Sequence, residues 1–372
     1  MKRRKFLKYN AIISGGALAG GALLPELMAN EEVLKVAQDH AAAERMVRVG
    51  CPAHNCGGRC LLKVFVREGV IVKIESDDRP GDSVADPQLR ACLRGRAYRH
   101  RQYHADRLKY PMKRVGKRGD GKFERISWDE ATDMMAENLR RIKEKYGNES
   151  IYVPYGTGSY NQINGRSTAS RLMNLMGGAL GYYNSYSWAC ISKATPYVFG
   201  TNISGNQRQD WVNAKYILMW GWNPSEMRDG TNSEFFVKKA RESGAKVVCI
   251  DPRMTLSAVG LADEWIPIRP GTDVALMSAM AYVLITEDLY DKDFVARFDA
   301  SQMPPGYEKE ESYKDYILGI RDGEPKTPAW AEKITSIPRD TIIRVAREYA
   351  TTNPGVLYQG YGMQRRAYGE QP

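Results

Sequence analysis

The sequence predicts an α/β protein in which a small, β-rich, cysteine-bearing unit precedes a doubly wound parallel sheet. From residue 150 onward, apolar runs of about five residues alternate with helical patterns, which is typical of a parallel sheet. Before that, residues 61–77 alternate with period two around Glu68-Gly69, which predicts a hairpin. A length of 372 residues with 43% hydrophobic residues allows two domains with a sizeable core.

The first 29 residues indicate an export signal. Arg3 and Arg4 precede an apolar run, 11–24, which is too short and too glycine-rich for a membrane span. This pattern is typical of a twin-arginine (Tat) signal peptide over residues 1–29, and the alternative is a basic anchor that stays in place. Export through Tat would place the protein in the periplasm or on the outer face of the cytoplasmic membrane.

The net charge of +10 raises nucleic acid as a partner. Residues 1–29 contribute +4 of it, and other basic residues cluster around Arg94–Arg118 rather than along one helix face. A basic groove for an anionic cofactor explains this distribution as well as nucleic acid does. No later run is long and apolar enough to predict a transmembrane helix.

The elements between the signal and residue 150 follow from local patterns. Residues 30–46 are rich in alanine and glutamate and predict a helical lead. Residues 78–90 predict a Pro/Gly/Asp loop. A helix is expected to follow Ser127 as N-cap, with Glu130 at the capping-box position and Gly147 at its end.

Five segments carry the α/β pattern beyond residue 150. The run at 215–220 predicts a strand, and a helix is expected from about Asn232. Cys249 lies in an apolar strand pattern and is expected to be a buried small hydrophobic residue. The five segments are SIYVPYGTG at 150–158, SRLMNLMGG at 170–178, AKYILMWGWNP at 214–224, SEFFVKKARESG at 233–244 and AKVVCIDPR at 245–253.

Four of the six cysteines gather in one short region, with three close together and one remote. Such uneven spacing favours a 4Fe–4S cluster. Zinc sites more often use two close pairs, and an exported protein could instead form disulfides, so both alternatives stay open. His54 lies inside the loop as a further candidate ligand. The four cysteines are Cys51, Cys56, Cys60 and Cys92.

Basic residues follow the fourth of these cysteines. Arg94 and Arg96 come directly after Cys92 in the chain. Cations beside an anionic cluster raise its reduction potential. The alternative is a solvated basic loop.

Three loops have the chemistry of phosphate or nucleotide binding. Gly221, Asn223 and Pro224 follow a predicted strand, and ligands of open α/β sheets bind beyond the carboxyl ends of strands. Each loop alone is also a plain turn or helix cap, and no strand is followed by a GxGxxG pattern, which weakens a nicotinamide or flavin prediction. The other two loops are Asp251 with Arg253, and Arg269 with Gly271, Thr272 and Asp273 before a predicted helix.

Taken in order, these motifs closely resemble the catalytic subunit of the dimethyl sulfoxide reductase family, the exported, membrane-associated type above all. These are molybdenum enzymes that carry bis(molybdopterin guanine dinucleotide), with tungsten as an alternative metal. The similarity extends from about residue 47 to the end. The matching segments are CLRGR at 92–96, ISWDEA at 126–131, WGWNPSE at 220–226, IDPR at 250–253, IPIRPGTD at 266–273 and QGYGMQR at 359–365.

The resemblance implies a domain plan and a role for each matched residue. A 4Fe–4S domain would occupy 47–107, and an incomplete molybdopterin oxidoreductase α/β domain 108–372, without the carboxy-terminal β-barrel domain. Cys51, with its longer gap, would be the least regular of the four cluster ligands. Arg94 would lie between cluster and pterin. The implied dinucleotide and pterin contacts are Gly221, Asn223, Pro224, Asp251 at the guanine, Arg253, Gly271, Thr272 and Asp273 at the pyrophosphate, Gln359, Gly360 and Gln364.

The same resemblance implies the metal ligand and the reaction. Ser187 aligns with the serine whose oxygen binds molybdenum, with Cys190 and Ser185 as competitors. The reaction would be two-electron reduction of an S-oxide or N-oxide, with electrons entering through the cluster, and Tyr155 would be a substrate contact. The partners would be a ferredoxin-like iron–sulfur subunit and a membrane anchor subunit, together with the Tat machinery and no nucleic acid.

Three alternatives stay open. The chain could be a truncated, non-catalytic iron–sulfur and nucleotide-binding remnant. It could be a family member acting on selenate or another oxyanion. The last alternative is a zinc-bearing nucleic-acid binder.

Overall fold

The computed structural model describes residues 44–52, 58, 60–154, 165–182, 188–202, 205–227, 230–297 and 312–370. The chain divides into two compact units. Unit 1 draws on Met1–Pro52, Arg59–Asp78 and Leu89–Tyr110, and unit 2 on Ala53–Gly58, Arg79–Gln88 and Pro111–Pro372. No helix in these described ranges combines the length and apolarity needed to cross a membrane.

Unit 1 is built on a three-stranded antiparallel sheet in the order β1-β2-β3. The predicted hairpin is confirmed, and Glu68 and Gly69 turn it with positive φ angles of 50° and 76°. Leu62 and Val64 of β2 are buried. The elements are β1 (Glu44–Gly50), β2 (Leu61–Arg67), β3 (Val70–Ser76), α4 (Leu93–Arg96) and α5 (Tyr98–Gln102).

The expected helical lead is wrong for residues 44–46. These residues begin strand β1, which pairs with β2 from Glu44 opposite Arg67 to Gly50 opposite Leu61. The unbroken ladder with β2 pairs the backbone groups on the inner side of this edge strand, and this tertiary pairing outweighs the local helix preference. Residues 1–43, and with them the signal peptide prediction, lie outside the described ranges.

Unit 2 begins with a short hairpin and two helices. Ser127 caps α6 as predicted, since its hydroxyl accepts the Glu130 N–H at 3.0 Å, and Gly147 ends the helix at φ 81°. The strand expected after residue 150 is wrong among the described residues there, because Tyr152 forms only an isolated bridge with Leu180. The elements are β4 (Met112–Arg114), β5 (Phe123–Arg125), α6 (Trp128–Tyr146), η1 (Asn148–Ser150) and α7 (Gly165–Leu175).

The rest of unit 2 is the predicted doubly wound fold, around a four-stranded parallel sheet in the order β8-β7-β6-β9. The strands are β6 (Tyr216–Trp220), β7 (Lys246–Ile250), β8 (Glu264–Ile266) and β9 (Gly355–Gln359), and sequence reasoning missed β9. The helices are α8 (Ala189–Phe199), η2 (Arg208–Asn213), α9 (Pro224–Met227), α10 (Ser233–Glu242), α11 (Leu256–Leu261), α12 (Asp273–Thr286), α13 (Lys292–Arg297), α14 (Tyr313–Leu318), α15 (Pro328–Thr335), α16 (Arg339–Thr351) and α17 (Tyr361–Gln364).

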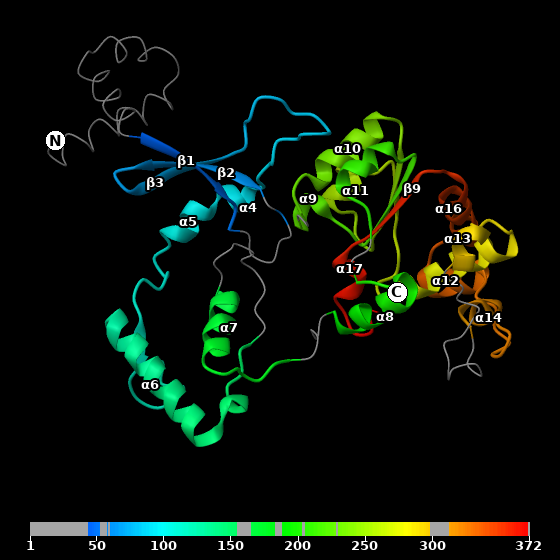
Figure 1. Cartoon of the computed structure of the whole chain (residues 1–372). Helices are drawn as coiled ribbons and strands as arrows, with labels where there is room; N and C mark the ends of the chain where they lie inside the picture. The colour runs from blue at the N-terminus through cyan, green and yellow to red at the C-terminus, as the bar shows by residue number, and fades with distance from the viewer. Residues whose placement is uncertain are drawn as a thin grey trace, which may run out of the picture. The chain divides into compact units, whose positions relative to one another are not determined.

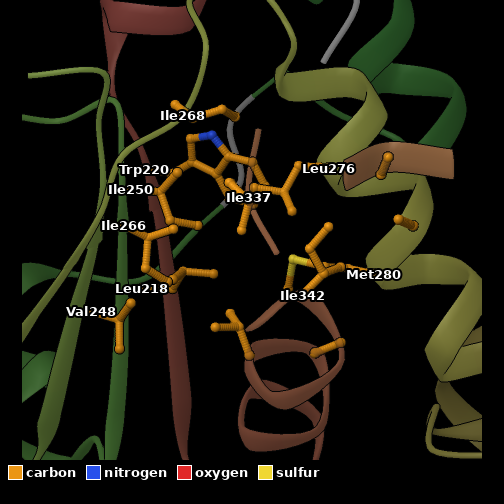
Figure 2. Packing of buried hydrophobic residues seen from close by; sticks show 14 of the residues in the cluster. Leu218, Trp220, Val248, Ile250, Ile266, Ile268, Leu276, Met280, Ile337 and Ile342 are labelled. Carbon is orange, nitrogen blue, oxygen red and sulfur yellow. The ribbon is translucent and has the colours of Figure 1, made fainter. Parts of the chain in front are cut away.

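Strand β6 is buried on both faces, and its sequence is therefore a continuous run of apolar residues. Tyr216, Leu218 and Trp220 face a cluster that includes residues of α12, α15 and α16. Ile217 and Met219 face the opposite cluster, with residues of α10 and α11. Figure 1 shows α9, α10 and α11 on one side of β9 and its neighbouring strands, with α12 and α16 on the other. Figure 2 shows Leu218 and Trp220 directed toward Leu276, Met280 and Ile342.

The strand order places a topological switch beside β6. From β6 the chain moves outward to β7 and β8, and it then returns to add β9 on the other side of β6. The crevice at the carboxyl ends of the two strands where the order reverses is the usual ligand position in such folds. Strands β6 and β9 meet there.

Candidate functional site

The carboxyl edge of the parallel sheet collects the loops that sequence analysis selected. The segment after β6 carries Gly221, Asn223 and Pro224, and the segment after β7 carries Asp251 and Arg253. The segment after β8 leads to Gly271 and Thr272, and the one after β9 contains Gly360. Because all four strands are parallel, these loops leave the sheet at the same edge.

Glycines allow the turns after β6 and β9 to cross in direct contact. Gly221 has φ +56°, and a Cβ there would lie 3.2 Å from the Met363 nitrogen. A Cβ at Gly360 would overlap the Gly221 carbonyl oxygen and lie 2.6 Å from the Trp222 Cα. The Gly360 N–H donates to the Trp220 carbonyl at 2.8 Å, and the Gly362 N–H to the Gly221 carbonyl at 3.0 Å. The close approach that Gly221 permits is therefore to the chain's own second turn.

An aromatic cluster lies below this crossing. The Trp222 ring stacks on Tyr358 with centroids 3.9 Å apart, and Trp211 meets both rings edge-on. Trp222 is 1% exposed, yet its indole Nε1 has no hydrogen-bond partner among the described residues. A buried donor without a partner costs about 1–3 kcal/mol. The buried rings of this cluster belong to the core on the α10 and α11 side of the sheet.

Asn223 and Arg253 share one carboxylate that sequence analysis did not select. The Asn223 side-chain amide donates to Glu226 Oε2 at 2.9 Å, and Arg253 Nη2 donates to the same oxygen at 2.8 Å. The Ser257 hydroxyl donates to Asn223 Oδ1 at 2.7 Å. The Arg253 guanidinium lowers the pKa of Glu226, so this carboxylate stays charged. Glu226 thus holds two of the predicted contact residues in place.

Asp251 is half-buried at the end of β7. Its Oδ1 accepts the Arg253 backbone N–H at 2.9 Å, and its carbonyl accepts the Trp265 indole N–H at 2.9 Å. Burial raises the pKa of the Asp251 carboxyl, and Arg253 only partly offsets this. A partly desolvated carboxylate at this edge is a strong acceptor for paired N–H donors.

Asp273 supports a neighbouring arginine at the start of α12. It is 6% exposed, and its Oδ1 accepts the Trp220 indole N–H at 3.0 Å. Arg366 Nη2 lies 3.4 Å from Asp273 Oδ2, and Arg366 Nε is buried with no partner among the described residues. A Cβ at Gly271 would lie 3.5 Å from the Arg366 guanidinium. A buried carboxylate repels phosphate, so Arg366 is the better anion contact in this pair.

Thr272 and the residues after β9 complete the edge. Thr272 is the N-cap residue of α12, but its hydroxyl donates to the Arg269 carbonyl at 2.7 Å rather than capping the helix. Gln359 and Gln364 line a cavity of 240 Å³ together with the first turn of α8. The remaining lining residues are Trp188, Ile191, Tyr358, Gly360, Tyr361, Met363, Gly369 and Glu370.

Helix α8 is joined to this cavity by Glu370. Glu370 Oε2 accepts the backbone N–H groups of Cys190 at 2.7 Å and Ile191 at 3.1 Å. Cys190 itself is exposed on the first turn. The competing Ser185, the predicted metal ligand Ser187 and the predicted substrate contact Tyr155 lie outside the described residues.

In unit 1 the described cysteines of the 51–92 region converge at one end of the sheet. The Cys51 N–H donates to the Cys60 carbonyl at 2.8 Å, next to the last β1–β2 pair. Cys92 is the N-cap residue of α4, and a Cβ at Gly95 in that helix would lie 3.2 Å from Cys51 Sγ. Arg94 is exposed on α4.

A complete ligand set is not visible in the described residues. Cys56 and His54 lie outside them, and within them no group of three or more His, Cys, Asp or Glu side chains could hold a metal ion. Cys249, as predicted, is a buried strand residue, and burial raises the pKa of its thiol to about 12.

Sequence reasoning missed Glu226, Arg366 and Glu370. Glu226 follows the selected turn by two residues, and its position in the Asn223 turn is a local signal that could have been used. Arg366 and Glu370 act on α12 and α8, which are distant in sequence, so no local pattern could identify their partners.

Comparison with known proteins matches both units to described families. Residues 107–371 match the family described as molybdopterin oxidoreductase, and residues 44–104 match its Fe4S4 domain. The whole chain is 44% identical to dimethyl sulfoxide reductase DmsA of Escherichia coli, covering 47% of that protein. It is 32% identical to a trimethylamine-N-oxide reductase of Haemophilus influenzae, covering 44% of it. The chain spans about half the length of these curated relatives.

A solved structure gives the same fold. Acetylene hydratase from Pelobacter acetylenicus superposes with a TM-score of 0.64 at 27% identity, over 86% of this chain and 41% of that one. The larger family match alone extends over most of the chain. The chain belongs to the molybdopterin oxidoreductase family.

Proposed function

We propose that this chain is the cofactor-binding part of a molybdenum-dependent catalytic subunit that reduces an S-oxide or N-oxide by two electrons. One observation carries the proposal. The loops expected to hold the dinucleotide leave one edge of a parallel sheet, in a chain 44% identical to a dimethyl sulfoxide reductase. We also propose a domain plan in which residues 1–29 form a signal peptide, residues 47–107 the cluster domain and residues 108–372 the pterin domain.

The chemistry of the carboxyl edge suits a guanine dinucleotide. The half-buried Asp251 carboxylate would accept the paired N–H donors of the guanine edge. Arg366, with a buried Nε that lacks a partner among the described residues, would meet the pyrophosphate together with N–H groups at the start of α12.

Other residues at this edge would shape the site. Glu226 would keep Asn223 and Arg253 oriented, and Pro224 would fix the start of α9. Gly221, Gly271 and Gly360 keep the backbone free of side chains where turns and ligand approach. Thr272 lies beside the α12 amides, while Gln359 and Gln364 would face the pterin from the cavity wall.

Bound molybdenum would supply the two-electron chemistry, and the protein would orient the group and exclude water. Ser187 is the proposed oxygen ligand, and Cys190 is the competitor. Both lie at or just before the first turn of α8, whose described residues Trp188 and Ile191 line the cavity. An oxygen donor suits a high-valent metal, whereas a thiolate favours softer metals.

A 4Fe–4S cluster held by Cys51, Cys56, Cys60 and Cys92 would deliver the electrons. The convergence of Cys51, Cys60 and the α4 start supports this proposal, as does the Fe4S4 domain match. Arg94 would place a cation between cluster and pterin and raise the cluster potential.

We further propose export by the Tat route to the periplasm or the outer face of the cytoplasmic membrane. The Arg3-Arg4 signal supports this proposal. A ferredoxin-like iron–sulfur subunit and a membrane anchor subunit would be the partners. The proposal includes no nucleic-acid partner, since an anionic cofactor explains the basic charge as well as nucleic acid does.

The test is reductase activity of the protein expressed from its complete reading frame. Under anaerobic conditions, the enzyme should oxidise dithionite-reduced viologen when dimethyl sulfoxide or trimethylamine N-oxide is added. Ser187→Ala should abolish this viologen oxidation while the iron content is retained. Turnover only with selenate, or full activity in Ser187→Ala, would contradict the proposed substrate class or ligand respectively.

A further inference from the structure

We infer that Glu370 is a positioning residue that fixes the first turn of α8 against segment 360–370. The inference deepens the proposed function and rests on it, because Ser187 precedes α8 by two positions in the chain. Glu370 would thereby set the approach of the metal-ligand segment to the pterin-facing loop.

The carboxylate of Glu370 makes contacts across a long stretch of sequence. Its Oε2 accepts N–H groups from Cys190 and Ile191, which are 180 and 179 residues away. Its Oε1 lies 3.4 Å from Gln364 Nε2, so one side chain contacts both α8 and the end of α17.

Helix α8 has no local cap. Its N-cap residue, Trp188, has φ −153° and makes no side-chain cap hydrogen bond. By contrast, α11, α14 and α15 are capped locally by Thr255, Ser312 and Thr327. Glu370 therefore satisfies amides that a neighbouring Ser or Thr satisfies elsewhere, and its charge also suits the positive end of the helix dipole.

Packing does little to fix α8. None of its residues is buried, whereas α12 buries several. Polar contacts at the helix end therefore contribute a larger share of what holds α8 in place. Gly369, which precedes Glu370, lies against the carbonyl oxygens of Met363 and Gln364, and its N–H donates to the Arg366 carbonyl at 3.0 Å. The Glu370 carboxylate thus reaches α8 from a segment that packs on the end of α17.

The contact also borders the cavity. Trp188, Ile191 and Glu370 form one part of the cavity wall, and Gln359 and Gln364 form another. Without the Glu370 carboxylate, the first turn of α8 would no longer be held in a fixed position relative to Gln359 and Gln364. The expected consequence is an altered environment of any metal held there, with the fold intact.

The experiment compares three variants. Glu370→Ala removes the acceptor, and Glu370→Gln keeps an acceptor without the charge. Thr327→Ala removes the local cap of α15, none of whose residues lines the cavity. Each cap is worth about 1 kcal/mol, so the two alanine variants should lose similar stability.

The first readout needs no cofactor. Amide hydrogen exchange at Cys190 and Ile191 should be about five- to tenfold faster in Glu370→Ala than in wild type. Glu370→Gln should restore part of the protection, and Thr327→Ala should leave both amides unchanged. Unchanged exchange in Glu370→Ala would overturn the inference.

The second readout is the electron paramagnetic resonance signal of the molybdenum centre. Glu370→Ala should change its shape, Glu370→Gln should change it less, and Thr327→Ala should leave it as in wild type. An identical change in Thr327→Ala, or none in Glu370→Ala, would overturn the positioning role. Wild-type protein without molybdenum would instead refute the proposed function, and the exchange arm would still decide the Glu370 contact.

Discussion

The charged side chains at the two ends of the parallel sheet are partnered to different extents. At the amino ends of the strands, charged side chains pair with one another. Lys246 Nζ lies 2.8 Å from Glu348, and Arg344 bonds both Glu348, at 3.1 Å, and Glu264. At the carboxyl ends, Arg366 makes one longer contact, 3.4 Å from Nη2 to Asp273 Oδ2, and its buried Nε has no partner among the described residues.

This difference fits the proposed division of roles, with stability at the amino ends and cofactor binding at the carboxyl ends. Ion pairs formed within the protein need no ligand, so their loss should affect folding alone. An arginine that the fold partners only in part can still contact an anionic ligand. Variants at the two ends should therefore separate stability from cofactor content.

The largest effect is expected from Gly360→Ala. The new Cβ would meet backbone atoms of Gly221 and Trp222, which cannot move aside without separating the two turns. We expect a loss of about 3 kcal/mol or more in the free energy of unfolding, measured by urea denaturation, together with loss of bound cofactor.

Gly260→Ala is the matched control for this substitution. Nothing lies within 4 Å of a Cβ at Gly260, which is in helix α11 without a positive φ. It should be neutral or gain about 0.5–1 kcal/mol. Equal losses in both variants would contradict the close crossing of the turns.

Arg366→Gln should come next and should affect binding more than folding. Loss of a charged hydrogen-bond donor is worth about 1.5–3 kcal/mol, so cofactor affinity should fall about ten- to 100-fold. The guanosine nucleotide released from purified protein is the measurement, with the midpoint of thermal unfolding as control. A large fall in the midpoint with full cofactor content would show that Arg366 serves stability, which contradicts a binding role for the carboxyl ends of the strands.

Glu348→Gln should show the opposite behaviour. Burial disfavours the Glu348 carboxylate, but hydrogen bonds from Lys246 and Arg344 outweigh this and lower its pKa. We expect a loss of about 1–2 kcal/mol in unfolding free energy at neutral pH, with unchanged cofactor content.

The pH dependence of this loss follows from the sign of the shift. A depressed folded-state pKa gives stability that is fully present above the ordinary value of 4.5 and disappears as pH falls through the folded-state value. Denaturation at pH 7 and pH 3 should show the difference between wild type and Glu348→Gln shrinking at the lower pH. A constant difference would contradict the ion-pair explanation.

Asp251→Asn should give the smallest change in stability, with the opposite sign. Burial raises the pKa of Asp251 above its ordinary value of 3.8, so ionising this carboxyl costs more in the folded cofactor-free protein than in the unfolded chain. The cost of ionisation appears as pH rises through the folded-state pKa. The variant should gain less than about 1 kcal/mol at pH 7 and nothing below pH 3.8, yet bind guanine nucleotide more weakly. Tighter binding would refute the guanine role of Asp251.

Sequence patterns predicted the layers of unit 2 because β6 and β7 are buried apolar runs followed by turn residues. They did not predict β9. Its exposure alternates, and it pairs with β6 only after the chain returns from α16. Residues 44–46 were also predicted incorrectly, because pairing with β2 outweighs their local preference.

Part of the site could likewise be predicted. The turn at Gly221 and the Asp251 segment were found because both follow strong strand signals. Sequence could not show that Asp273 supports Arg366, or that Glu370 caps α8, because these partners are 93 and 180 residues apart. Such contacts arise from the fold and leave no periodicity in the sequence.

The central claim is that these loops and cysteines hold a pterin-bound metal and an iron–sulfur cluster. Metal and nucleotide analysis of anaerobically purified protein, from its complete reading frame, tests it most directly. We expect about four irons per chain, with molybdenum or tungsten and released guanosine nucleotide. About one zinc per chain, with neither iron nor molybdenum or tungsten, would contradict it.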